Sequence, residues 1–122
     1  MPKLGRSQSS IGVSLATLVT NFQTLGAVAT HTETVPAGRR WLLLGGDIER
    51  DAAATLQISI RDTANNVIIR SKTEPAGTTR VDVASLFYTM PQPLDPAWDI
   101  LVTWGVAQTT PEISLEVLEI AT

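Results

Sequence analysis

The chain has 122 residues, no cysteine and a formal net charge of −3. Disulfides and thiolate metal sites are therefore excluded, and nothing favours nucleic acid as a partner, which usually requires clustered lysine and arginine. No apolar run approaches the roughly 20 residues of a membrane-spanning helix, so no membrane partner is expected either. Only 17% of the residues are charged while 43% are hydrophobic, whereas soluble domains usually have about 25% charged residues. This composition predicts that part of the outer surface contacts protein.

The N-terminal residues 1–10 are small, polar and basic. They have too little apolar surface to fold alone, so we expect a flexible arm that orders against a neighbouring subunit or another partner. They also lack the apolar stretch of a secretory signal, which predicts a protein made in the cytoplasm. Residues 11–122 are long enough for one domain with its own core.

The segment 11–22 has two interpretations. Ile11, Val13 and Leu15 alternate with small residues, which is the period of a strand. Apolar residues at 15, 18, 19 and 22 also fit one face of a helix. The frequent valine and threonine favour the strand, because β-branched side chains suit a pleated surface.

The stretch 35–46 is the centre of the predicted fold. Pro36 and Gly38 indicate a turn, since proline presets φ and glycine supplies a positive φ. The strand that follows is apolar on both faces: Trp41 and Leu43 point to one side, Leu42 and Leu44 to the other. A strand with one face in water alternates apolar and polar residues instead. We therefore expect a second layer over Leu42 and Leu44.

The remaining segments also indicate strands. Leu56, Ile58 and Ile60 alternate with polar residues and are predicted to point inward. The other predicted elements are a hairpin loop at 62–66, a strand at 67–72, a second Pro-Ala-Gly turn at 74–77, a long strand at 81–90 ended by the prolines at 91 and 93, and strands at 98–104 and 112–120. About eight strands with frequent turns predict an all-β fold, an antiparallel β-sandwich of jelly-roll-like type with an extended N-terminal arm.

Three acids offer the clearest candidate for chemistry. On a regular strand Asp47, Glu49 and Asp51 share a face, at about 6.6–6.8 Å between alternate positions. That spacing suits the carboxylates of an inverting glycosidase or a loose calcium site. The simpler interpretation is a solvated strand end whose acids lie near Arg50 and Arg61. We favour the second and expect no enzymatic activity.

Other catalytic or cofactor signatures are weak. His31 is the only histidine, and no Gly-x-Ser-x-Gly motif exposes a serine nucleophile. One histidine without cysteine does not make the usual zinc site. Gly45-Gly46 is followed by an acid, which has the wrong charge for cradling phosphate. We therefore predict no catalytic, cofactor-binding or metal-binding residue, and we expect His31 at a polar edge or interface.

The tryptophans have two possible roles. Aromatic side chains on a sandwich can form a platform on which sugars stack. Trp98 and Trp104 share a strand face with Ile100 and Val102, and Trp41 lies next to apolar residues. We therefore assign all three to the core.

Two stretches resemble those of a known group of proteins. Val35 to Leu44 is a Val-Pro-Ala-Gly turn leading into a tryptophan-containing strand, and Leu94 to Trp104 is an aliphatic-Asp-Pro-Ala-Trp lead into an alternating strand. Both are similar to stretches of the small β-sandwich proteins of tailed-bacteriophage virions, particularly head decoration (cement) proteins. The resemblance implies a trimer bound to the major capsid protein over capsid-subunit junctions. It also implies synthesis in the host cytoplasm, a final location on the capsid surface, and stabilisation of the shell.

The sequence thus predicts a structural virion protein without an active site. The candidate subunit or capsid interface consists of Ile11, Val13, Leu15, Leu42 and Leu44. The alternative is a carbohydrate- or receptor-binding β-sandwich module of a phage tail, which would need a tryptophan exposed at a rim beside polar groups.

Overall fold

The computed structural model describes residues 16–86 and 90–122, and most of these lie in β-strands. The described elements are β1 (Ala16–Thr24), β2 (Val28–Thr34), β3 (Arg39–Ile48), β4 (Ala54–Asp62), β5 (Val67–Gly77), β6 (Val81–Asp82), the helical turn α2 (Val83–Leu86), β7 (Gln92–Leu94), β8 (Asp99–Gln108) and β9 (Glu112–Ala121). The predicted arm, residues 1–10, and the interface candidates Ile11, Val13 and Leu15 lie outside the described residues. Within the described ranges, no helix is long and apolar enough to cross a membrane.

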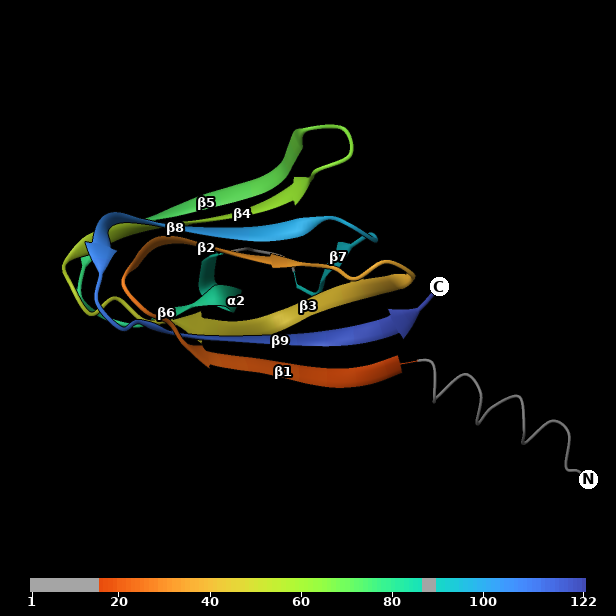
Figure 1. The fold of residues 1–122 in the computed structure, drawn as a ribbon, viewed down its shortest axis with the longest axis horizontal. Coiled ribbons are helices and arrows are strands. Elements are labelled where there is room, and N and C mark those ends of the chain that lie inside the picture. Colours follow the sequence, from red (N-terminus) through yellow and green to blue (C-terminus); the bar gives the residue numbers. More distant parts are fainter. Residues whose placement is uncertain (1–15, 87–89) are drawn as a thin grey trace, which may run out of the picture.

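The strands form two antiparallel sheets that pack face to face (Figure 1). Sheet A has the order β1-β9-β3-β6, with β7 also paired to β3, and sheet B has the order β2-β8-β4-β5. The pairs are nested along the chain: β1 with β9, β2 with β8, β3 with β6 and β7, and β4 with β5. This nesting across two sheets is the arrangement of a jelly roll. The predicted all-β antiparallel sandwich is confirmed.

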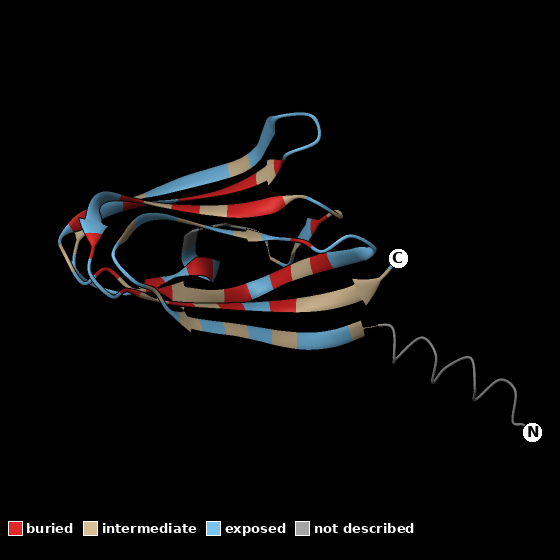
Figure 2. Cartoon of the chain, in the orientation of Figure 1, coloured by how far each residue is buried: buried red, intermediate tan, exposed pale blue. Residues whose placement is uncertain are grey.

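The hydrophobic core fills the space between the two sheets, where the buried segments of the strands face one another (Figure 2). Leu56, Ile58 and Ile60 of β4 are fully buried, as their alternation with polar residues predicted. The other fully buried apolar side chains of the paired sheets include Leu43, Ile48, Ile100, Val102, Ile113, Leu115 and Val117. The inner faces of β8 and β9 follow the same period-two rule, whereas in β3 the rule holds only up to Leu43, because a β-bulge lets Ile48 also point inward.

The turn before β3 forms as predicted. The Arg39 N–H donates to the Pro36 carbonyl oxygen at 3.1 Å, and Gly38 has a φ of 75°. The register between β3 and β9 then shifts between Leu43 and Gly45, so a β-bulge lies where the two adjacent glycines predicted a bulge or bend. Segment 16–24 is a strand, which resolves the described part of the earlier ambiguity in favour of strand.

The predicted turn at 74–77 is wrong, because β5 continues through Pro75 to Gly77. The proline is tolerated there since β5 is the edge strand of sheet B. The register with β4 also shifts between Ala54 and Leu56, opposite this part of β5. The Pro-Ala-Gly sequence therefore marks an irregular strand end.

The predicted long strand at 81–90 is also wrong. It ends after β6, because Asp82 starts a helical turn: its Oδ1 accepts the Ala84 N–H at 3.0 Å, and Ser85 Oγ donates to the Asp82 carbonyl at 2.7 Å. Such local bonds from aspartate and serine compete with strand pairing. Pairing with β3 resumes at β7, within the segment that the prolines were expected to leave as a break.

Candidate functional site

Asp47 and Glu49, two of the three candidate acids, belong to an ion-pair cluster around Arg80. Arg80 lies 2.7 Å from Asp47, 3.5 Å from Glu49 and 3.1 Å from Glu112. These bonds join the end of β3 to the start of β9, and Glu49 also accepts the Glu112 backbone N–H at 2.9 Å. The carboxylates raise the pKa of Arg80, with the hydrogen bond to Asp47 as the largest cause. The cluster holds strand ends together.

Asp51, the third acid, has different hydrogen-bond partners from Asp47 and Glu49. Its carboxylate accepts the backbone N–H groups of Thr109 at 3.1 Å and Thr110 at 2.6 Å, in the loop between β8 and β9. The three acids therefore do not converge on one space. Among the residues that the structure describes, no group of three or more His, Cys, Asp or Glu side chains is arranged to hold a metal ion.

The arginines expected beside these acids have other partners. Arg50 is buried and donates to carbonyl oxygens, including that of Ala54 at 2.9 Å. Arg61 makes two hydrogen bonds of 2.7 Å to Asp99, which raise the pKa of Arg61. The partner of the acids is Arg80, which lies more than 30 positions further along the chain and was not identified from the sequence.

A triple variant, Asp47→Asn, Glu49→Gln and Asp51→Asn, tests the expectation that these acids carry no catalysis. It should remain folded and lose only about 1–2 kcal/mol of unfolding free energy, because exposed ion pairs contribute about 0–1 kcal/mol each and the amides can still accept hydrogen bonds. Urea denaturation would measure the loss. Hydrolysis of a glycan panel by the wild type that disappears in the triple variant would contradict the expectation.

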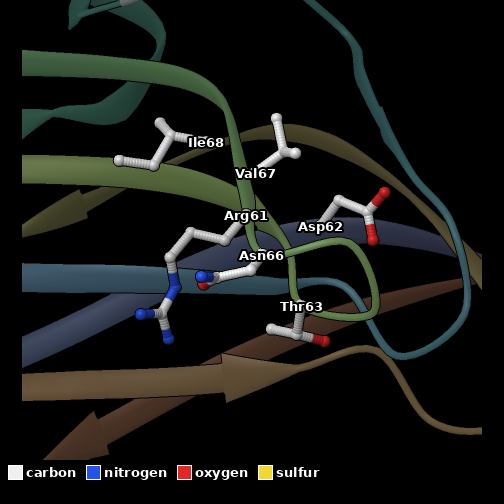
Figure 3. A pocket seen from close by; sticks show the side chains of 6 residues that line it. All are labelled: Arg61, Asp62, Thr63, Asn66, Val67 and Ile68. Atoms are coloured by element: carbon white, nitrogen blue, oxygen red, sulfur yellow. The ribbon is translucent and has the colours of Figure 1, made fainter.

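A small hollow lies at the β4–β5 hairpin (Figure 3). It is lined by Arg61, Asp62, Thr63, Asn66, Val67 and Ile68, and its volume is about 120 Å³. Small-molecule sites usually span about 300–1,000 Å³. Its polar groups are already engaged: Arg61 binds Asp99, and Asp62 accepts the backbone N–H groups of Ala64 and Asn65 at 3.1 and 3.2 Å. The hollow therefore makes a poor candidate for a ligand site.

His31 belongs to a polar cluster between the edge strands of the two sheets. Its Nε2 contacts Glu33 on β2, and Glu33 also accepts hydrogen bonds from Asn21 and, at 2.9 Å, from Gln23 on β1. Gln23 donates a further bond to Asn21 at 2.8 Å. These contacts connect β1 of sheet A to β2 of sheet B at one edge of the sandwich. The position agrees with the polar edge expected for His31.

All three tryptophans pack inward, as predicted. Trp41 is 7% exposed and Trp104 2% exposed, while Trp98 is partly buried and packs against the core. The Trp41 Nε1–H donates to Glu119 at 2.9 Å, and the Trp104 Nε1–H donates to the Glu49 carbonyl oxygen at 3.0 Å. These bonds satisfy the indole N–H groups within the sandwich. None of the three tryptophans therefore forms an exposed platform on which a sugar could stack.

The outer face of sheet A carries a row of apolar side chains. Leu18 of β1 pairs with Leu118 of β9, Leu118 pairs with Leu42 of β3, and Leu42 pairs with Pro93 of β7. Directly paired residues of antiparallel strands point to the same side of a sheet. Leu18 is 60% exposed, and Leu42 and Leu118 are half-buried. The row thus crosses four strands and faces outward.

Two further apolar side chains lie on the same face, outside this row. Phe22 of β1 is 58% exposed, and Leu44, at the bulge of β3, is 39% exposed. We call Leu18, Phe22, Leu42, Leu44 and Leu118 together the apolar face of sheet A. Sequence reasoning identified Leu42 and Leu44 but not the other three. Leu18 and Phe22 are four positions apart, so a strand places both on one face with Thr20 between them, and only a firm strand assignment for β1 would have revealed this.

The outer face of sheet B is different in character. Thr30, Thr32 and Thr34 of β2 are exposed, and their partners on β8 are Thr103, Leu101 and Asp99. The next strand adds polar side chains, including Gln57, whose amide donates to Ser71 at 3.1 Å. The two outer faces therefore differ in part, with hydroxyl groups on β2 of sheet B and the leucine row on sheet A. Sheet B also exposes apolar side chains: Val106 near the end of β8, and Val67, Ile68 and Ile69 at the start of β5.

No protein-family model matches the chain, and no curated protein matches it in sequence. Among solved structures the chain is similar to a family 6 carbohydrate-binding module, with a TM-score of 0.35 and 9% sequence identity, over 87% of this chain and 94% of the module. A likeness at this level supports no statement about function.

Proposed function

We propose that this protein is a structural virion protein, a decoration (cement) protein that binds the outside of a phage head and stabilises the shell. Its partners are further copies of itself, with a trimer favoured by the resemblance noted above, and the major capsid protein. The observation that carries the proposal is the apolar face of sheet A. The role proposed for this face is to bind other protein surfaces, and no catalysis is proposed.

Exposed leucine and phenylalanine on a regular sheet favour contact with another protein surface. Burying apolar surface contributes about 25 cal/mol per Å², and contiguous apolar patches on soluble proteins often mark interaction sites. Leu18, Leu118 and Leu42 lie side by side through the pairing of their strands. A flat apolar row of this kind can bury many contacts against a partner without a conformational change in the sandwich.

The contrast between the two outer faces gives the proposed assembly an orientation. Sheet A, with its apolar face, points toward the partner, while sheet B, with its threonines at positions 30, 32 and 34, points toward solvent. Hydroxyl groups on an exposed strand keep their hydrogen bonds to water. A protein bound by sheet A would thus present the hydroxyl groups of β2 to the outside, together with the apolar side chains at the start of β5.

One observation favours the alternative, a carbohydrate- or receptor-binding module of a phage tail. Phe22 is an exposed aromatic ring in one cross-strand row with Ser114 and Asp47, and sugar sites combine aromatic and polar groups. The decoration role is preferred because Leu18, Leu118 and Leu42 form an apolar row on the same face, separated from the Phe22 row by the row of Thr20 and Glu116. Under the alternative, the wild type should bind a glycan array, and Phe22→Ala should abolish that binding. Under the preferred role, both proteins should show only background binding.

Leu42→Lys and Leu44→Lys test the assembly role. Each should dissociate the oligomer and weaken attachment to heads at least tenfold, because a lysine forced into a dry interface without a partner is costly. The measurements are mass in solution at high micromolar concentration, and co-sedimentation with purified heads that lack the protein. Thr32→Lys, on the exposed face of sheet B, is the matched control and should retain both properties.

The proposal fails if the wild-type protein is strictly monomeric and also does not sediment with heads. It also fails if Thr32→Lys weakens assembly as much as Leu42→Lys does, because the face of sheet A would then have no special role.

A further inference from the structure

We infer that the free edge of β1 binds β1 of a second copy of this chain, in an antiparallel pair related by a two-fold axis at Thr20. The inference goes beyond the proposed function and does not rest on capsid binding. It follows from the regular edge of β1, from the features that disfavour pairing at the other edges, and from the self-complementary sequence of this strand.

β1 is the outermost strand of sheet A (Figure 1). One side of it pairs with β9 over nine consecutive residue pairs, from Ala16 to Thr24, without a register shift. Among the residues that the structure describes, no strand pairs with its other side. Backbone N–H and C=O groups alternate between the two sides of a strand, so about half of those of β1 point toward this open side. A regular edge strand of this kind is a template for strand addition.

The other described edge strands carry features that disfavour such pairing. β5, at one edge of sheet B, contains Arg70, Lys72 and Pro75, and its register with β4 shifts twice. β2, at the other edge, has a register shift and an inward-pointing acid, Glu33. β6 and β7 are only two and three residues long. Charges, proline, bulges and short strands are the usual means by which proteins prevent pairing between edges.

β1 has none of these features. Its sequence, ATLVTNFQT, contains no charged residue, no proline and no glycine. None of its residues is buried, whereas the neighbouring strand β9 buries Ile113, Leu115 and Val117. β1 is therefore open to pairing along its whole length, and its own side chains would bring no charge into the contact.

The outward side of β1 is self-complementary when Thr20 pairs with Thr20 of the second copy. In an antiparallel pair with this register, Leu18 lies opposite Phe22 of the second copy, and Phe22 lies opposite Leu18 of the second copy. Aromatic and aliphatic side chains that lie directly opposite each other stabilise a sheet. The two-fold axis produces this contact twice.

The inward side of the same pair is uncharged. Val19 lies opposite Asn21 of the second copy, and Thr17 lies opposite Gln23. Asn21 and Gln23 already donate hydrogen bonds to Glu33 of their own chain. Closing the edge therefore does not leave these amides without a partner.

This register also gives Phe22 a place in an apolar row. Within one copy, the row of Thr20 separates Phe22 from the leucine row. Across the two-fold axis, Phe22 continues the row that Leu42, Leu118 and Leu18 form in the second copy. Antiparallel strands related in this way keep the same side of the sheet facing outward, so the two apolar faces would form one continuous surface.

The contact is isologous, because the same edge serves both copies. Once two copies have paired, neither has a free β1 edge, and the contact closes at a dimer. The trimer implied by the resemblance would need a different contact.

Disulfide formation in the full-length protein tests the register. The chain has no cysteine, so Thr20→Cys introduces a single thiol per copy. Directly opposite residues have Cα atoms about 4.5–5.5 Å apart, which is within the range of a disulfide. Thr24→Cys is the matched control, exposed on the same side of β1, and its two thiols would lie about 26 Å apart along the strands. We expect at least tenfold more disulfide-linked dimer from Thr20→Cys under mild oxidation.

Equal yields from the two cysteine variants overturn the inference, and so does the absence of a covalent dimer from Thr20→Cys. Leu42 lies on β3, two strands from the contact, so adding Leu42→Lys should leave the Thr20→Cys disulfide unchanged. The two proposals can therefore fail separately. Without the disulfide the protein can still bind heads, and with it Leu42→Lys can still leave head binding intact.

A charge exchange gives a readout without a thiol. Leu18→Lys combined with Phe22→Lys should be monomeric, because like charges would lie directly opposite each other. Leu18→Glu combined with Phe22→Glu should be monomeric for the same reason. An equimolar mixture of the two should form heterodimers, which native mass spectrometry would identify by their mass. A mixture that stays monomeric while circular dichroism shows both variants folded contradicts the inference, as does a dimer of either variant alone.

Discussion

Gly46→Ala should lower the free energy of unfolding by about 4 kcal/mol or more, because a backbone clash adds to backbone strain. A Cβ at this position would lie 2.0 Å from the Ser114 carbonyl oxygen and 2.9 Å from the Leu115 Cα on β9. Gly46 also has a φ of 130°, a conformation that favours glycine. The clash is with main chain, so no side-chain rotation relieves it, and β3 would have to move away from β9.

The matched control is Gly26→Ala, in the loop between β1 and β2. Nothing lies within 4 Å of a Cβ at that position, so its effect should stay within about 1 kcal/mol in either direction. Urea titration of both variants by tryptophan fluorescence measures the difference. Equal effects at the two glycines would show that the close approach of β3 and β9 at Gly46 does not govern stability.

Arg50→Met should lower the free energy of unfolding by about 3–6 kcal/mol, since each buried acceptor left without a donor costs about 1–3 kcal/mol. Arg50 is 3% exposed. Its guanidinium donates to the carbonyl oxygens of Thr79 at 3.0 Å, Ala54 at 2.9 Å and Pro75 at 2.6 Å. A further bond of 3.0 Å reaches Thr79 Oγ1. One side chain thus joins β4, the end of β5 and the loop before β6.

Arg40→Met is the control for this change. Arg40 is exposed and bonds to Asp95 at 3.1 Å, so its loss should cost less than about 1 kcal/mol. Methionine keeps much of the apolar volume of the arginine stem, and the comparison therefore isolates the hydrogen bonds. Similar losses from the two variants would contradict a structural role for the buried guanidinium.

Arg50 also explains why the end of β5 was misjudged from the sequence. Pro75 and Gly77 have the composition of a turn, but the bond from Arg50 to the Pro75 carbonyl holds the chain against the start of β4. That bond joins residues 25 positions apart. Local turn propensity is weaker than a buried charged donor with several acceptors, so tertiary contacts decided the conformation.

The acids of β3 show the same limit at the candidate site. Their types and spacing were visible, but Arg80 and Glu112 are brought beside Asp47 only when β6 and β9 pair with β3. The nearer arginines in sequence, Arg50 and Arg61, have other partners. Proximity along the chain therefore predicted the wrong cation.

The sequence by itself determined the fold class and the inward positions. Period-two alternation requires no knowledge of partners, and it correctly placed Leu56, Ile58 and Ile60 in the core and Leu42 and Leu44 on the opposite side from Trp41 and Leu43. Gly38 was likewise predictable, because a positive φ in a tight turn is a property of single residues.

Only the tertiary structure decided which outward residues form a surface. Leu18, Leu42 and Leu118 come from the beginning, middle and end of the chain, and they share a row because β9 pairs between β1 and β3. Each strand's own pattern indicates which side a residue faces but not its neighbours on the next strand. The register between strands distant in sequence supplies that information, and the apolar face of sheet A exists only through it.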